Sequence, residues 1–361
     1  VSDGPVGVRG RAMGPGLVVP GPSALAATWN TDLIGAIGTA LGDEAHDRRV
    51  QLLLAPTVNI HRVPLGGRHF ECYSEDPELT SRAAVAYIEG VQSQGVGACI
   101  KHFVANDQEF ERREVDIVVD ERALREIYLP PFEAAVTEAG VRSVMGAYNF
   151  VNGRHACAHD ELLVDLLKGE WGFDGFVVSD WVAVKETVES GRGGLDLEMP
   201  APGHHWGNGK LAAAVTAGQV SEQAVDDKVR RLLGFLEWCG KLDEGTDHEE
   251  AHVDRPEARA LARRAGAESA VLIHDRRQLL PLDPASVSSV AVIGPGAAGT
   301  AMLGGGSASL EPHRATNVLE ALGARVDVPV QHAAGVTLAR AAAPVPPSWL
   351  PPEGATVELF D

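Results

Sequence analysis

Short apolar runs alternate along the chain with longer segments that carry apolar residues every three or four positions. Runs of aliphatic and β-branched residues bounded by Gly, Pro or Asp are typical of buried strands, and the longer spacing is typical of helices. The candidate strands are 52–60, 96–103, 141–149, 174–180 and 194–199. Strands that alternate with helices in this way predict βα units around a parallel sheet, and not a sandwich of hairpins.

The clearest helical segments are 120–140 and 221–240. The first begins with Asp120 as a cap and ends at Gly140, and its Pro130-Pro131 pair predicts a kink. The second begins with Ser221 and ends at Gly240, which makes it a good last helix of a barrel. Its expected buried face consists of Val225, Val229, Leu232, Leu233 and Leu236.

The length of 361 residues exceeds that of a usual single domain, so we expect a barrel of ~250 residues and part of a second domain. The acidic stretch 241–257 has no apolar periodicity and predicts an exposed linker. We therefore expect a barrel over 1–240 and part of a second, α/β domain over 258–342. The proline-rich segment 343–361 is expected to be a stiff connector.

Charge and composition narrow the classes of partner. The chain has 31 Lys and Arg against 50 Asp and Glu, and this net charge of -19 argues against a nucleic-acid partner. No apolar run approaches a membrane span, so we expect a soluble protein without a membrane partner, with secretion or a cytoplasmic location left open. The four cysteines, without CxxC spacing, are expected to pack as small hydrophobes, so neither a metal nor a cofactor is predicted.

The segment WGFDGFVVSDW, from Trp171 to Trp181, carries the strongest chemical signal. Asp180 directly follows a strand-like run and precedes Trp181. The exit of a parallel strand is where ligands bind, and an aromatic residue there can form one wall of a sugar site. The alternative is that Asp180 caps a helix that begins at Val182. The residues alone leave both interpretations open.

Other polar groups also follow apolar runs. A pocket lined by such donors and acceptors and by a flat aromatic face complements a polyhydroxylated ring, so a sugar is the predicted ligand. These groups are Asp3, Arg9, Arg68, Lys101, His102, Arg112 and Tyr148. By contrast, we expect Glu109 and Glu111 to belong to a solvated turn, and His61, His69, His155, His204 and His205 to be polar loop residues.

A GxGxxG pattern at Gly294, Gly296 and Gly299 raises the alternative of a dinucleotide site. Such a site needs a helix that begins in the loop, and the glycines at 304–306 disfavour one. We expect instead a strand followed by a glycine loop that overhangs a neighbouring site.

Seven motifs in order over about 200 residues resemble glycoside hydrolase family 3, of the β-glucosidase type. They are SDGPxGVR, GRxFExYSEDP, KHFxANDQE, ERALREIYLPPFE, YNxVNG, WGFDGFVVSDW and GLDLEMP. The later pieces AESAVLIHD, LLPL, VAVIGP and GGGSA are similar to the opening of the family's second domain. The resemblance implies a TIM-like (β/α)8 barrel followed by the start of an α/β sandwich. It also implies a retaining mechanism on a small β-glucoside or oligosaccharide.

The resemblance also implies roles for the residues. Asp180 is the expected nucleophile, and Trp181 is expected to border the bound sugar. Asp3 is expected to accept hydrogen bonds from the 4- and 6-hydroxyls, which favours a glucoside over a xyloside. We expect Arg112 or Lys101 to keep the pKa of Asp180 low. The other implied contacts to the sugar come from Arg68, Lys101 and His102, with Arg9, Arg112 and Tyr148 completing the subsite.

The acid/base residue has no counterpart here. In the family it is usually a Glu farther along the second domain, and Glu268 and Glu311 are expected to be structural or exposed. The KHFVANDQE stretch does not fit the branch that uses an Asp-His pair. We therefore expect a fragment whose TIM-like barrel over 1–240 has a truncated first strand, and whose tail leads towards an inserted PA14-type domain. Other family 3 activities, such as β-xylosidase or exo-glucanase, a non-catalytic sugar-binding protein, and a homodimer stay open.

Overall fold

The computed structural model describes residues 1–10, 14–242, 249–299, 302–303 and 305–336. They divide into a first unit of residues 1–273 with 303–313, and a second unit formed by the rest. The connector predicted at 343–361 lies outside the described residues. Among the helices of the described part, none has the length and apolar composition that crossing a bilayer requires.

The first unit is built on five parallel strands whose spatial order is their order in the sequence. They are β1 (Ser2–Asp3), β2 (Leu52–Leu54), β3 (Gly97–Phe103), β5 (Ser143–Gly146) and β8 (Phe176–Ser179). A parallel bridge from Val178 to Leu197 adds the segment predicted at 194–199 to the edge of β8. Successive parallel neighbours are what consecutive βα units of a barrel produce. The predicted strand 52–60 is shorter than expected, because Pro56 has no N–H for the ladder.

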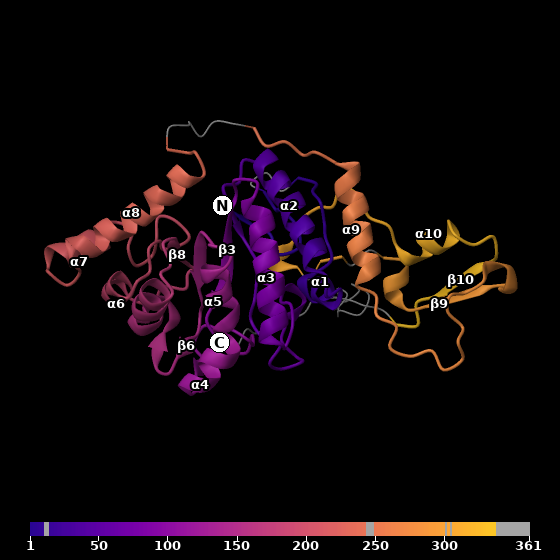
Figure 1. The fold of residues 1–361 in the computed structure, drawn as a ribbon, viewed down its shortest axis with the longest axis horizontal. Coiled ribbons are helices and arrows are strands. Elements are labelled where there is room, and N and C mark those ends of the chain that lie inside the picture. Colours follow the sequence, from indigo (N-terminus) through magenta and orange to yellow (C-terminus); the bar gives the residue numbers. More distant parts are fainter. Residues whose placement is uncertain (11–13, 243–248, 300–301, 304, 337–361) are drawn as a thin grey trace, which may run out of the picture. The chain divides into compact units, whose positions relative to one another are not determined.

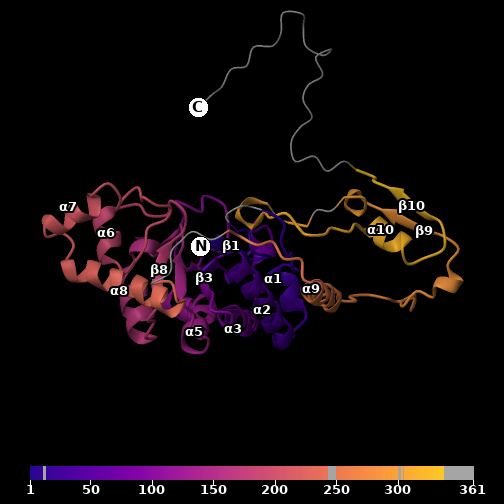
Figure 2. The same cartoon turned by 90° about the horizontal axis from the view of Figure 1, so that it is seen from above.

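Helices connect these strands. Figure 2 shows α2 (Thr31–Asp47), α3 (Pro77–Gln92) and α5 (Pro130–Thr137) side by side along one face of the strands. The other α-helices of the unit are α1 (Pro22–Ala27), α4 (Glu121–Ala123), α6 (Thr187–Arg192), α7 (Lys210–Thr216), α8 (Glu222–Trp238) and α9 (Pro256–Glu268) (Figure 1). A small separate sheet consists of β4 (Asp116–Ile117), β6 (Phe150–Val151) and β7 (Arg154–His155).

The predicted helix 120–140 is divided at its proline pair. The Asp120 side chain accepts a hydrogen bond from Ala123 N, and a π-helical turn follows over Leu124–Tyr128. Helix α5 then starts anew with Pro130 at its first position, where a missing N–H costs nothing. The prediction of one kinked helix is therefore replaced by two helical segments, with the second beginning at Pro130.

Helix α8 begins as expected, because Ser221 accepts a hydrogen bond from Ala224 N. Its predicted buried face is right for Leu232 but wrong for Val229 and Leu233. Val229 and Leu233 are 48% and 47% exposed, whereas Leu232 and Phe235 pack against the cluster that contains Phe176. Lys228 is buried as well, so the contact face of the helix lies toward Lys228, Leu232 and Phe235.

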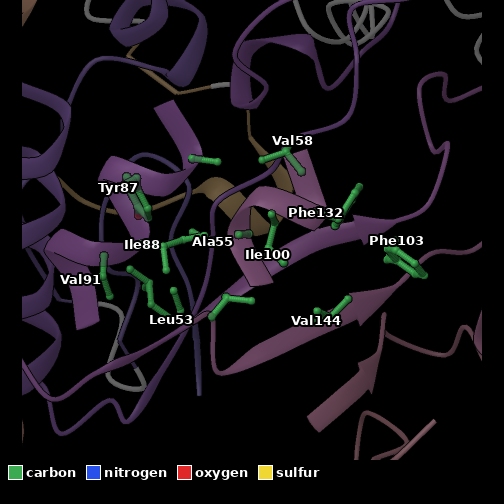
Figure 3. Packing of buried hydrophobic residues seen from close by; sticks show 14 of the residues in the cluster. Leu53, Ala55, Val58, Tyr87, Ile88, Val91, Ile100, Phe103, Phe132 and Val144 are labelled. Atoms are coloured by element: carbon green, nitrogen blue, oxygen red, sulfur yellow. The ribbon is translucent and has the colours of Figure 1, made fainter. Parts of the chain in front are cut away.

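The core lies between the strands and the helices that cover them. Figure 3 shows Ile100 of β3 close to Ala55, with Ile88 of α3 and Val144 of β5 on either side. The ring of Phe103, at the end of β3, packs edge-on against Phe132 at 5.0 Å between centroids. This packing fixes the ends of the strands, from which the polar groups project.

Two later segments belong to the first unit. Residues 303–313 return to it, and Gly16 N donates to Glu311 O at 2.8 Å while His313 N donates to Gly16 O at 2.9 Å. In the stretch predicted as an exposed linker, Ala251 N donates to Asp47 O, and α9 already begins at Pro256. The described part of that stretch is therefore hydrogen-bonded to the barrel, while residues 251–253 and 256–257 are exposed.

The second unit contains a parallel pair of strands, β9 (Val290–Ile293) and β10 (Val330–Ala333), with helix α10 (Val318–Gly323). After β9 the glycine pattern forms a single 3-10 turn over Pro295–Ala297. The next α-helix among the described residues begins only at Val318. The dinucleotide alternative therefore lacks the helix that would bind the pyrophosphate.

Candidate active site

One pocket of about 460 Å³ contains every residue predicted to bind or react with the ligand. We call it the strand-end pocket. The predicted residues that line it are Asp3, Arg9, Arg68, Lys101, His102, Arg112, Tyr148, Asp180 and Trp181. Its other lining residues are Gly67, Phe70, Glu71, Glu109, Met145, Gly305, Gly306 and Ser307.

The strands explain why these distant residues meet. Asp3 closes β1, Lys101 and His102 lie near the end of β3, and Asp180 directly follows β8. Parallel neighbours end at the same edge of the sheet, so side chains from these exits converge. Tyr148 comes two residues after β5 and donates from its hydroxyl to Trp181 O at 3.0 Å.

Asp180 is a buried carboxylate with two different oxygens. The residue is 8% exposed, and Oδ1 accepts a hydrogen bond from Trp181 N at 2.6 Å. Oδ2 has no hydrogen-bond donor among the described residues and lies 3.4 Å from His102 Nε2. No helix begins at Val182, and α6 starts only at Thr187. The helix-cap interpretation of Asp180 is therefore wrong.

The pKa of Asp180 and the partner of Arg112 differ from the expectation. Burial raises the pKa of Asp180 above its ordinary value, although the charges of Lys101 and Arg68 oppose this shift. The predicted low pKa is therefore wrong, although Lys101 acts on it in the predicted direction. Arg112 is engaged elsewhere, because its guanidinium donates to Glu109 Oε2 at 2.7 Å and lies 4.8 Å from the centre of the Tyr148 ring.

Arg68 is held by Glu71, which sequence reasoning missed. Glu71 is 2% exposed, forms an ion pair with Arg68 Nε and accepts a hydrogen bond from Thr57 Oγ1 at 3.2 Å. Burial works to raise the pKa of Glu71, but Arg68 lowers it below the ordinary value. The i,i+3 spacing of the two residues within GRHFE was the available signal.

Each of the four carboxyl groups that line the strand-end pocket faces a basic side chain. Asp3 faces Lys101, Glu71 faces Arg68, Glu109 faces Arg112, and Asp180 faces His102. Glu109 was expected in a solvated turn and instead lines the pocket. The i,i+3 spacing of Glu109 and Arg112 was the available signal.

A buried ion pair between Arg48 and Glu44 holds the backbone of the segment that carries Arg9. Arg48 is 1% exposed, and its Nη2 lies 2.8 Å from Glu44 Oε1. The same guanidinium donates to Arg9 O at 3.2 Å and to Pro15 O at 2.5 Å. Leu17 N donates to Glu44 at 3.1 Å. The pair therefore fixes the backbone on both sides of residues 11–13.

The glycine loop reaches the pocket as expected. Gly305, Gly306 and Ser307 line it, and Ala308 and Leu310 pack with Val6 of the barrel. The prediction that this loop overhangs a neighbouring site is confirmed.

Of the histidines expected to be polar loop residues, His61 contacts two backbone carbonyls and His155 contacts Tyr148 O at 3.0 Å. Within the described ranges, no group of three or more His, Cys, Asp or Glu could hold a metal ion.

Comparisons with known proteins agree with this geometry. Residues 3–235 match the glycosyl hydrolase family 3 N terminal domain, and residues 270–345 match the family's C-terminal domain. A beta-glucosidase of Rhizobium radiobacter is 51% identical over 326 residues, which are 89% of this chain and 40% of that protein. A probable beta-glucosidase I of Aspergillus niger is 43% identical over 93% of this chain and 41% of its own length.

The beta-glucosidase of Kluyveromyces marxianus in complex with glucose has a similar structure. The TM-score is 0.88 at 34% identity, over 94% of this chain and 42% of that one. This likeness confirms the expected fold class, a TIM-like barrel followed by an α/β sandwich domain. The chain spans about 40% of the length of the curated relatives it matches. The family models together cover most of its residues, and the chain belongs to glycosyl hydrolase family 3.

Proposed function

We propose that the protein to which this chain belongs is a retaining β-glucosidase, with Asp180 as the nucleophile. The observation that carries the proposal is the buried Asp180 carboxylate, whose Oδ2 has no hydrogen-bond donor in the described part of a pocket otherwise rich in donors. The similarity to beta-glucosidases of bacteria and fungi supports the choice of substrate.

In the proposed reaction, Asp180 Oδ2 attacks the anomeric carbon of a terminal β-glucosyl residue. A carboxylic acid protonates the glycosidic oxygen as the C1–O bond breaks, which leaves a covalent glycosyl ester on Asp180. Water, deprotonated by the same acid/base group, then cleaves the ester and releases glucose with its β configuration. Lys101 and Arg68 favour the carboxylate form that the first step requires.

The rest of the strand-end pocket would bind the sugar. Asp3 would accept from the 4- and 6-hydroxyls, and Arg68, Lys101 and His102 would contact the other ring hydroxyls. Arg9, Arg112 and Tyr148 would complete the subsite, and Trp181 would border the ring. The pocket's volume of about 460 Å³ is suited to one monosaccharide unit.

We assign the acid/base role to none of the described carboxyl groups in the pocket. Arg68 lowers the pKa of Glu71, which favours its ionised form and not a proton donor, and the Glu109 carboxylate accepts from Arg112. Glu268 lies on α9, where it accepts from Asn30 Nδ2, and Glu311 contributes its backbone carbonyl to Gly16. The proposal therefore leaves this role to a residue outside the described set.

Trapping of the ester tests the proposal. The whole protein would be incubated with an activated 2-deoxy-2-fluoro-β-glucoside, digested, and mapped by mass spectrometry. We expect one labelled peptide with the sugar on Asp180, slower labelling in the presence of glucose, and none in Asp180→Asn. A label on another carboxylate would refute the assignment, and no label at all would count against a retaining mechanism.

A further inference from the structure

Asn59 makes three polar contacts with His102, two with its backbone and one with its ring. The residue lies in the loop after β2 and is 5% exposed, and His102 is 1% exposed. Asn59 Nδ2 donates to His102 O at 3.0 Å, and His102 N donates to Asn59 Oδ1 at 3.0 Å. The ring atom His102 Nδ1 lies 3.1 Å from the same Oδ1.

These backbone partners fix the direction of the Asn59 amide. A carbonyl can only accept and a backbone N–H can only donate, so the atom facing His102 O must be Nδ2 and the atom facing His102 N must be Oδ1. An amide oxygen has no hydrogen to give. The contact between Oδ1 and the ring is therefore a hydrogen bond only when His102 Nδ1 carries the proton.

The surroundings keep the imidazole neutral. The charged groups that act on His102 are Arg68, Lys101, Arg112 and the facing carboxylate of Asp180. Burial, together with the three cations, lowers the pKa of His102 well below its ordinary value. A neutral ring with its proton on Nδ1 has a lone pair on Nε2, the atom that lies 3.4 Å from Asp180 Oδ2.

We propose that Asn59 is a positioning residue that locks His102 in the Nδ1–H tautomer, so that Nε2 accepts a hydroxyl hydrogen of the sugar and cannot donate to Asp180 Oδ2. The second half of this statement rests on the proposed function of Asp180. In the other tautomer, Nε2–H would donate to the carboxylate and occupy a lone pair that has to attack C1. Such a charge-assisted bond would stabilise the ground state and slow the reaction.

Neutron diffraction on a deuterium-exchanged crystal of the whole protein tests the tautomer directly. We expect nuclear density for deuterium on His102 Nδ1, directed at Asn59 Oδ1, and none bonded to Nε2. Deuterium bonded to Nε2 would overturn the inference. This result does not depend on whether Asp180 is the nucleophile, which the fluoroglucoside experiment decides separately.

The substitution Asn59→Asp tests the consequence for catalysis. A carboxylate at this position favours an imidazolium, whose Nε2–H would then donate to Asp180 Oδ2. We expect kcat for an aryl β-glucoside to fall roughly tenfold, and the acidic limb of its pH profile to move to higher pH by roughly one unit, because more His102 is protonated.

Asn152→Asp is a matched control. Asn152 makes the same two-point contact with a backbone, because its Oδ1 accepts from Val119 N at 3.0 Å and its Nδ2 donates to Val119 O at 2.9 Å. Among the described residues, no histidine ring shares its oxygen. We expect its pH profile to match that of the wild type. If the two variants changed kcat and the acidic limb equally, the role of Asn59 in setting the tautomer would be refuted.

Discussion

Lys101 Nζ lies 3.5 Å from Asp3 Oδ1, and this contact joins the exit of the third strand of the sheet to that of the first. Lys101 is 2% exposed, so its ammonium has little water to reorganise around it. Two groups proposed to bind the sugar therefore keep each other in place before any ligand arrives, which reduces the ordering that binding would otherwise require.

Asp3→Asn should change the choice of substrate. The proposed contact of Asp3 with the 6-hydroxyl exists in glucosides and is missing in xylosides. We expect kcat/KM for a p-nitrophenyl β-glucoside to fall roughly 10- to 100-fold, as for loss of a hydrogen bond to a charged group, with a smaller fall for the β-xyloside. An equal fall for both substrates would contradict the 6-hydroxyl assignment.

Lys101→Met should shift the pH dependence. Lys101 lowers the pKa of Asp180 against the effect of burial, so its removal raises that pKa further. The nucleophile is active as a carboxylate, and the acidic limb of kcat/KM should therefore move to higher pH by roughly one unit. Arg112→Met is the control, since its guanidinium is paired with Glu109. We expect this variant to lose activity without moving the limb.

Glu71→Gln should disturb the position of Arg68. The amide keeps the shape of Glu71 but removes the charge that holds the guanidinium. We expect kcat/KM for the aryl glucoside to fall roughly 10- to 100-fold, as small misplacements in active sites do. Glu78→Gln removes half of an exposed pair with Arg82 and should leave activity unchanged. Wild-type kinetics in Glu71→Gln would show that Arg68 needs no such support.

Arg48→Met should destabilise the fold. It would leave Glu44 buried without its counter-charge, and Arg9 O and Pro15 O without their donor. We expect a loss of roughly 3–5 kcal/mol in the free energy of unfolding, measured by urea denaturation. Arg82→Met breaks a half-exposed pair with Glu138 and should cost at most about 1 kcal/mol. Similar losses of unfolding free energy in the two variants would show that the buried pair contributes no more to stability than the half-exposed one.

The candidate strands 96–103, 141–149 and 174–180 placed Lys101, Tyr148 and Asp180 at or near strand exits, and the exits of parallel strands converge. Local pattern was enough for these three residues, whereas the roles of Asp3, Arg68 and Arg112 came from the resemblance to family 3. It was also enough for the cap at Ser221, where one side chain meets a backbone group three residues away.

What the sequence could not predict depends on contacts between distant residues. Nothing near Asn59 indicates that its amide meets His102, 43 positions later. The pKa of Asp180 is raised by burial, which is a property of the assembled pocket. For α8, the apolar pattern is nearly as strong around Val229 as around Leu232, so the buried side depends on which neighbours it meets.

The return of residues 303–313 to the first unit has a consequence for how the chain can be divided. A single backbone cut anywhere in 274–302 would place Asp180 and the wall formed by Gly305, Gly306 and Ser307 on different polypeptides. The wall would then stay in place only through non-covalent contacts such as Gly16 with Glu311 and Val6 with Leu310. Cleavage of this stretch by a protease would thus convert one chain into two fragments. They would have to stay associated to keep the wall of Gly305, Gly306 and Ser307 on the pocket.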